Sequence, residues 1–150
     1  MENLDITRVR KALSDQAPLL FNYGPVVFAY LYGSYARGDV HPFSDVDIGI
    51  YLEKMTPAEA LNNELSLALE FDDILGSKTN VDVRSINTMP LLIKGHIVTE
   101  GILLYSRNDS LRIEFESSVR MAYFDFRYFL NRNQKEYLSY TVGGNDDGYR

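Results

Sequence analysis

Three aspartates, Asp45, Asp47 and Asp82, have the residue type and spacing expected of an oxygen-only metal site. Asp45 and Asp47 stand at the head of an apolar segment with the alternation of a strand. Alternate side chains of a strand point to the same face, so these two carboxylates would lie about 7 Å apart along one edge of a sheet. Carboxylate oxygens suit Mg²⁺ or Mn²⁺, and two such ions can hold a triphosphate and activate an attacking hydroxyl.

Asp82 is the third candidate because it lies in the middle of a predicted strand, residues 79–86, between Val81 and Val83. A carboxylate at such a position is disfavoured by β-propensity and by burial unless something pairs with it. If this strand lies beside that of Asp47, three carboxylates meet on one sheet face, and a cation would pair with all of them. The alternative is an edge-strand residue that faces solvent.

The dipeptide Gly33-Ser34 predicts a phosphate-binding turn at the end of an apolar run. Glycine lets the backbone turn tightly, and Ser34 is expected to cap a short helix whose free N–H groups point at an anion. Arg37 follows in the same turn. It can bind phosphate or carboxylate through two hydrogen bonds, or it can pair with Asp39, and the sequence favours neither.

Four segments have the composition and alternation of strands. Residues 26–32 carry β-branched and aromatic side chains on both faces, which predicts a central strand covered on both sides. The second strand begins at Asp45, and its face opposite the aspartates carries Val46, Ile48, Ile50 and Leu52. The other two strands are predicted at residues 79–86 and 102–105.

Helices are predicted before, between and after these strands. Residues 4–13 have the spacing of a short amphipathic helix. The segment Thr56–Glu59 supplies an N-cap, a proline at the first helical position and a glutamate three residues after the cap, and Gly76 supplies a stop. The predicted buried stripe of this helix is Leu61, Leu65, Ala68 and Leu69. Further helices are predicted at residues 88–100 and, as one or two helices, at 110–140.

The composition indicates one domain with a hydrophobic core. The chain has 150 residues, of which 45% are hydrophobic. A net charge of -6 argues against a general nucleic-acid-binding surface, because phosphate contacts need clustered Lys and Arg. The absence of cysteine excludes disulfides and thiolate sites. No apolar run approaches the ~18 residues of a membrane span, and we expect a soluble cytoplasmic protein.

The spacing Gly33-Ser34, ten residues, then Asp45-x-Asp47 resembles the signature of the nucleotidyltransferase fold related to DNA polymerase β. GSYARG followed by SDVDIGI is similar to its minimal nucleotidyltransferase (MNT) branch, as are VDVRSI and LLIKGHIVTEGILLYSRN, so the resemblance covers about residues 25–105. It implies an α+β fold, with a small mixed sheet flanked by helices. The expected domain is residues 1–142, with a helical extension at 110–140 and a flexible tail at 143–150.

The resemblance also implies roles for individual residues. Asp45, Asp47 and Asp82 would be catalytic residues and ligands of two Mg²⁺ ions, and Gly33 and Ser34 would bind the triphosphate of ATP. Members of the MNT branch are commonly antitoxins of HEPN-domain RNase toxins. The implied reaction is Mg²⁺-dependent AMPylation, the transfer of AMP from ATP to a tyrosine of the toxin.

Two other functions remain open. The chain could be a binding-only antitoxin that masks its toxin, or a nucleotidyltransferase that acts on a small molecule such as an aminoglycoside. The intact acids and turn favour an enzyme, and the small size favours an acceptor that arrives on another protein. Arg84 departs from the family pattern, because related sequences often run apolar or acidic after the third carboxylate. It would either bind substrate or pair with Asp82 and weaken its role as a base.

The C-terminal helical segment is rich in aromatic residues. On a helix one stripe, expected to cover the sheet, consists of Phe115, Val119, Ala122, Phe126 and Phe129. Tyr123, Phe124 and Tyr128 lie away from the centre of that stripe. They either pack in a thick core or form an interface with the toxin or with a second copy of the chain.

Overall fold

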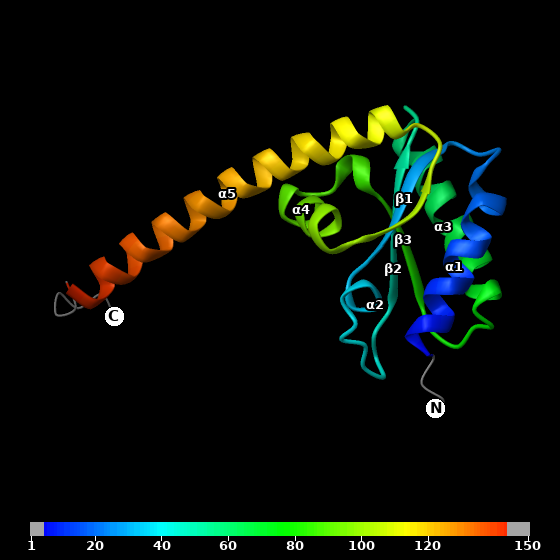
Figure 1. The fold of residues 1–150 in the computed structure, drawn as a ribbon, viewed down its shortest axis with the longest axis horizontal. Coiled ribbons are helices and arrows are strands. Elements are labelled where there is room, and N and C mark those ends of the chain that lie inside the picture. Colours follow the sequence, from blue (N-terminus) through cyan, green and yellow to red (C-terminus); the bar gives the residue numbers. More distant parts are fainter. Residues whose placement is uncertain (1–4, 144–150) are drawn as a thin grey trace.

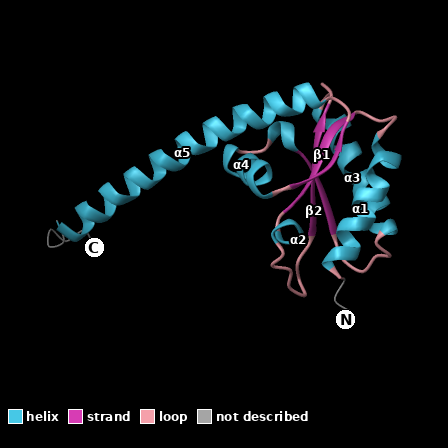
Figure 2. Ribbon diagram, viewed as in Figure 1, coloured by secondary structure: helices cyan, strands magenta, loops and turns pink. Residues whose placement is uncertain are grey.

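The computed structural model describes residues 5–143, with side chains as far as residue 134, and contains a four-stranded sheet between two layers of helices (Figure 1). The elements in chain order are α1 (Ile6–Phe21), β1 (Val26–Tyr32), α2 (Ser34–Arg37), β2 (Val46–Leu52), α3 (Pro57–Ile74), β3 (Val81–Ser85), the 3₁₀ turn η1 (Ile86–Thr88), α4 (Leu91–Glu100), β4 (Ile102–Ser106) and α5 (Asp109–Gly143). Figure 2 shows α1 and α3 on one side of the sheet and α4 on the other. The predicted α+β fold is confirmed.

The strand order in the sheet is β3-β2-β1-β4. β1 runs antiparallel to both β2 and β4, whereas β3 runs parallel to β2 because α3 connects the two strands as a crossover. β1 is therefore central, and six of its seven residues are buried, as its apolar sequence predicts. β3 lies at one edge of the sheet and β4 at the other.

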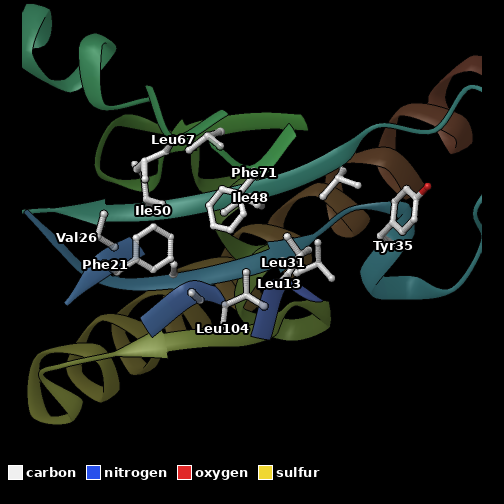
Figure 3. Packing of buried hydrophobic residues seen from close by; sticks show 14 of the residues in the cluster. Leu13, Phe21, Val26, Leu31, Tyr35, Ile48, Ile50, Leu67, Phe71 and Leu104 are labelled. Atoms are coloured by element: carbon white, nitrogen blue, oxygen red, sulfur yellow. The ribbon is translucent and has the colours of Figure 1, made fainter. Parts of the chain in front are cut away.

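The main hydrophobic core lies between the sheet and the helices α1 and α3. The four apolar side chains of β2 that alternate with its polar face are all buried there, as predicted from the sequence. Figure 3 shows Ile48 and Ile50 with Phe21 of α1 and Phe71 of α3 around them. The rings of Phe21 and Phe71 have their centroids 5.7 Å apart. This core fixes the positions of β2 and β3, the two strands that carry the candidate site.

The start of α3 follows its sequence signals, but its buried face differs from the prediction. Thr56 accepts from the Glu59 amide and Glu59 accepts from the Thr56 amide, which completes the predicted capping box. The predicted stripe was wrong for three leucines, since Leu61, Leu65 and Leu69 are exposed. The buried side chains of this region are instead Leu67, Phe71 and Leu75. The predicted leucines and the buried side chains both recur every four residues, so periodicity alone could not separate the two sets. Contacts with α1 and β3 determine which set is buried.

Two other helices differ from the prediction in their bounds. α1 extends to Phe21, well past residue 13, and tolerates Pro18 within it, while the predicted Leu4 lies outside the described residues. The helix predicted at residues 88–100 begins at Leu91, after η1 and Pro90. Within residues 5–143, no helix combines the length and apolarity that crossing a bilayer requires.

The C-terminal segment is a single helix, α5, which leaves the body of the domain (Figure 1). Its first turns are held by Glu116, which accepts from the hydroxyl of Tyr30 in β1 and from Arg112 at 3.0 Å. The predicted stripe was partly wrong, because Ala122 and Phe129 are exposed. The face toward the domain consists of Phe115, Val119, Tyr123 and Phe126. α5 contains Gly143, the first residue of the predicted tail, and the other tail residues lie outside the described range.

α5 packs on α4 through a notch formed by a glycine. Gly95 lies in the middle of α4, and a Cβ atom at this position would lie 2.1 Å from Cδ2 of Tyr123. Tyr123 is buried for this reason, as one of its two interpretations predicts, although it lies away from the centre of the predicted stripe. The missing side chain at position 95 thus sets the course of α5 across the domain.

We predict that Gly95→Ala destabilises the protein, although alanine normally stabilises a helix interior relative to glycine by about 1 kcal/mol. The added methyl group would displace Tyr123 and cost about 1 to 3 kcal/mol of overpacking. Thermal unfolding followed by circular dichroism measures the change. Leu92→Ala, an exposed position of the same helix, is the control. An increase in melting temperature for Gly95→Ala would contradict the proposed notch.

Candidate active site

The parallel pairing of β2 and β3 brings the predicted carboxylates together. Asp47 and Asp82 are direct register partners across the two strands. Asp45 lies one residue before β2, exposed, two positions from Asp47. The expectation that the Asp82 strand lies beside that of Asp47 is therefore confirmed. β3 is also an edge strand, and the Asp82 side chain is 37% exposed, so both sequence interpretations describe part of the arrangement.

Gly33 lies directly against Asp47, in a backbone conformation that favours glycine. Gly33 follows β1, whose last residue Tyr32 pairs with Asp47. A Cβ atom at position 33 would lie 2.4 Å from Oδ2 of Asp47, and Gly33 has a φ of 71°. This φ is itself unfavourable for residues with a side chain. The glycine thus allows the carboxylate of Asp47 to lie directly against the turn.

The short helix α2 begins at Ser34, so the expectation that Ser34 caps it was wrong. Gly33 occupies the N-cap position, without a side-chain hydrogen bond. The N–H groups of Ala36 and Arg37 both donate to Gly33 O, at 3.1 and 3.0 Å. The preceding amides, at Ser34 and Tyr35, belong to the first turn, where a helix leaves its N–H groups without partners within the helix. They are the groups that could bind an anion.

Arg10 of α1 holds this turn from behind. Its Nε donates to Tyr35 O at 2.8 Å and its Nη2 donates to Ala36 O at 2.9 Å. A cation at the C-terminal end of α2 also complements the helix dipole. Arg10 was not predicted from the sequence, because the basic residues of a surface helix are mostly solvated and no local signal marks the one that reaches a distant turn.

A cleft of about 700 Å³ contains all the predicted site residues. This volume is within the usual range of small-molecule sites. The lining comprises Tyr32, Gly33, Ser34, Arg37, His41, Phe43, Ser44, Asp45, Asp47, Asp82, Arg84, Ile93, His96 and Glu100. Both histidines of the sequence are among these residues. Neither histidine was predicted as a site residue, although His96 lies in the family-like segment at residues 91–108, because the resemblance assigns no role to it.

The three aspartates create a strongly negative environment. Burial, with added repulsion from Asp82 and Asp45, raises the pKa of Asp47 to about 6. Burial also raises the pKa of Tyr32 to about 12, and the carboxylates of Asp47 and Asp82 contribute to that rise. A nearby cation would favour the ionised form of these carboxylates and relieve their repulsion.

These residues fit a divalent cation in chemistry, but they do not form a closed ligand set. Within residues 5–134, no three His, Asp or Glu side chains converge on a common point. Arg84 instead pairs with Asp82, with 2.9 Å between Nε of Arg84 and Oδ2 of Asp82. Its guanidinium group supplies a positive charge next to Asp82. Of the two roles predicted for Arg84, pairing with Asp82 is therefore present. Asp45 and Asp47 carry the oxygens that could hold a metal, and Asp82 could join them if Arg84 moved aside.

Arg37 lies at the mouth of the same cleft. Its Nε is 3.2 Å from Asp39 Oδ2, and its Nη1 is 3.9 Å from Glu100 Oε2. Arg37 therefore pairs with Asp39, as one of its two interpretations predicts. It is also exposed and lines the cleft, so its position is compatible with phosphate binding.

We predict that Asp47→Asn stabilises the protein at pH 7.5 in the absence of divalent cations. The raised pKa means that the folded state retains a proton that the unfolded chain has released between about pH 4 and 6, so the wild type loses stability as the pH rises through this range. Partial solvent access limits the gain to about 1 to 2 kcal/mol.

Urea unfolding at pH 5 and pH 7.5 with EDTA measures this effect. The difference between Asp47→Asn and the wild type should be larger at pH 7.5. Asp73→Asn, an exposed carboxylate of α3, is the matched control. If Asp47→Asn were less stable than the wild type at pH 7.5, the ionised carboxylate of Asp47 would not destabilise the folded state.

Comparison with known proteins gives a consistent assignment. The family model described as polymerase beta, nucleotidyltransferase matches residues 17–110. A Methanocaldococcus jannaschii protein, provisionally named a protein adenylyltransferase, is 33% identical over 85 residues, which are 57% of this chain and 85% of that protein.

Solved structures with the same fold include two complexes. The rebuilt and re-refined structure of a tri-AMPylated Shewanella oneidensis HEPN toxin with an MNT antitoxin matches with a TM-score of 0.60 and 16% identity, over 86% of this chain and 98% of that one. A toxin-antitoxin structure with AMP-PNP matches with a TM-score of 0.54 and 19% identity, over 93% and 99% of the two chains.

The family match spans more than half of the chain and includes the Gly33-Ser34 turn and all three aspartates. The chain belongs to the polymerase beta nucleotidyltransferase family.

Proposed function

We propose that the protein is an Mg²⁺-dependent protein adenylyltransferase that transfers AMP from ATP to a tyrosine of a HEPN-domain toxin and thereby neutralises it. The observation that carries this proposal is the placement of Asp47 against the Gly33 turn and opposite Asp82, in one cleft. The family assignment supports nucleotidyl transfer. The name of the M. jannaschii relative and the AMPylated toxin in a complex of the same fold support the acceptor class.

The roles of the residues follow from their positions. The amides at the start of α2 would bind the triphosphate, with Ser34 and Arg37 beside them, and Asp45, Asp47 and Asp82 would hold two Mg²⁺ ions. The bound ions would neutralise the phosphates and lower the pKa of the attacking hydroxyl. Asp82 would accept the proton of that hydroxyl as pyrophosphate leaves, which requires that it release Arg84 first. Most of the rate would come from positioning and charge complementarity.

Mass spectrometry of an acceptor protein tests the reaction directly. The purified chain is mixed with ATP, Mg²⁺ and a HEPN protein from the neighbouring reading frame that has an Arg-x4-His motif. We expect an adduct of the mass of AMP on a tyrosine, and we expect Asp45→Ala with Asp47→Ala to reduce it at least about 100-fold. Omission of Mg²⁺ should have the same effect, and Asp73→Ala is the matched control.

Other outcomes would favour the competing functions. A chain with both aspartates replaced that still neutralises the toxin in cells would indicate a binding-only antitoxin. Nucleotide turnover with an aminoglycoside and no protein acceptor would indicate a small-molecule transferase. The chain contains no cysteine, which fits a reducing compartment, and we place the reaction in the cytoplasm.

The exposed face of α5 is the surface that we assign to partner binding. Met121, Phe124 and Tyr128 recur at helical spacing on the face opposite the one that packs on α4, and they are 71%, 55% and 70% exposed. Large apolar side chains in such a stripe are typical of a protein interface. Tyr123 is not part of it, because its ring is buried against Gly95.

We predict that Phe124→Ser with Tyr128→Ser weakens co-purification of the HEPN protein at least about tenfold, because two exposed anchors are lost without disturbing the domain. Affinity pull-down with size-exclusion chromatography measures it. Ser117→Ala with Asn131→Ala, two exposed polar positions of the same helix, is the control. Unchanged co-purification would exclude this stripe as the interface.

A further inference from the structure

Among residues 5–143, no strand pairs with the outer edge of β3. Val46 N–H donates to Asn80 O at 2.9 Å, so Asn80, Asp82 and Arg84 direct their backbone groups toward β2. Because backbone groups alternate along a strand, Val81, Val83 and Ser85 direct theirs outward. Ser85 N–H donates a hydrogen bond to Glu64 Oε1 at 2.8 Å. Within residues 5–134, no side chain or loop pairs with the outward groups of Val81 and Val83.

A groove of about 470 Å³ runs along this edge. On one side it is bounded by Leu61, Leu65 and Ala68 of α3, and on the other by Met89, Pro90 and Ile93. Leu61 and Leu65 are the leucines that the periodicity placed in the core and that are instead 52% and 57% exposed. The groove therefore combines unpaired backbone groups with apolar walls, the two elements that bind an extended peptide by strand addition.

The groove is continuous with the cleft of the candidate active site. Tyr32, Asp82, Arg84 and Ile93 line both. The face of β3 that carries Asp82 and Arg84 is the catalytic face, whereas Val83 faces the core with α3. A strand added at this edge would direct alternate side chains to the two faces. Every second side chain would then point toward Asp82, and the others toward the leucines of α3.

We propose that this groove, here termed the β3-edge groove, binds the acceptor protein as an extended segment that adds to β3 and presents its hydroxyl-bearing side chain to Asp82. The inference rests on the proposed function for the identity of the acceptor. The segment carries apolar residues directly before and after the acceptor tyrosine, and these contact Leu61 and Leu65. Glu64 closes the groove at Ser85, so pairing is confined to the part of β3 nearest the three aspartates.

Hydrogen exchange tests the groove without requiring catalysis. The Asp45→Ala/Asp47→Ala protein is mixed with a synthetic peptide of about nine residues that has a central tyrosine between two leucines. We expect the exchange of the Val81 and Val83 amides to slow at least about tenfold. The same peptide with N-methyl-leucine, which keeps the apolar side chains but lacks the backbone donors, should give no protection. Unchanged exchange of these amides with the leucine peptide overturns the proposal. Protection that appears without peptide and grows with protein concentration also overturns it, because it would indicate a second copy of the chain at this edge.

Kinetics with the active protein provide the second readout. Leu65→Glu should raise the KM for the peptide at least about tenfold and leave the affinity for ATP unchanged, whereas Leu19→Glu, at a more exposed leucine on α1, should change neither. Equal KM values for Leu65→Glu and the wild type overturn the proposal. If no acceptor is ever AMPylated, the proposed function fails, and the exchange measurement still decides whether the groove binds an extended chain.

Discussion

The crowding of three carboxylates at one end of a sheet is the constraint on which the rest of the structure depends. Asp47 faces Asp82 across paired strands, with Asp45 two residues earlier, and the burial of Asp47, together with repulsion from the other two carboxylates, disfavours its ionised form. Such a cluster is tolerated only where strong packing holds its strands. The core of β1 and β2 supplies that packing, and Arg84 offsets part of the negative charge from the edge. The packing of the apolar sheet thus offsets the unfavourable electrostatic energy of the site.

The sequence predicted the sheet and the carboxylates because each depends on short-range signals. The alternation in β2 fixed which face Asp47 occupies, and the capping box fixed where α3 begins. Arg10 could not be predicted in the same way, because its hydrogen bonds to the carbonyls of Tyr35 and Ala36 join residues more than twenty positions apart. The histidines of the cleft were missed because the residues around them assign no chemical role to either side chain.

Helix faces were the main error, and the cause is the same in two helices. The region of α3 has two apolar stripes with the same period, and the choice between them depends on contacts with α1 and β3. In α5 the burial of Tyr123 depends on a glycine about thirty positions earlier in the chain. The spacing of apolar residues indicates that a helix has an apolar face, whereas tertiary contacts decide which apolar face is buried. Two of the misplaced leucines are informative in themselves, since Leu61 and Leu65 line the β3-edge groove.

The close approach of Gly33 to Asp47 has a consequence for how this site can evolve. Position 33 must satisfy a positive φ and must also leave room for a carboxylate oxygen, and glycine alone meets both requirements. A single substitution there would therefore disturb the candidate site as a whole, and the geometry of this turn cannot be adjusted in small steps. Variation in rate or acceptor preference among descendants of this chain would have to arise at the rim of the cleft, at positions such as Arg84 and Phe43, where a larger or smaller side chain meets open solvent.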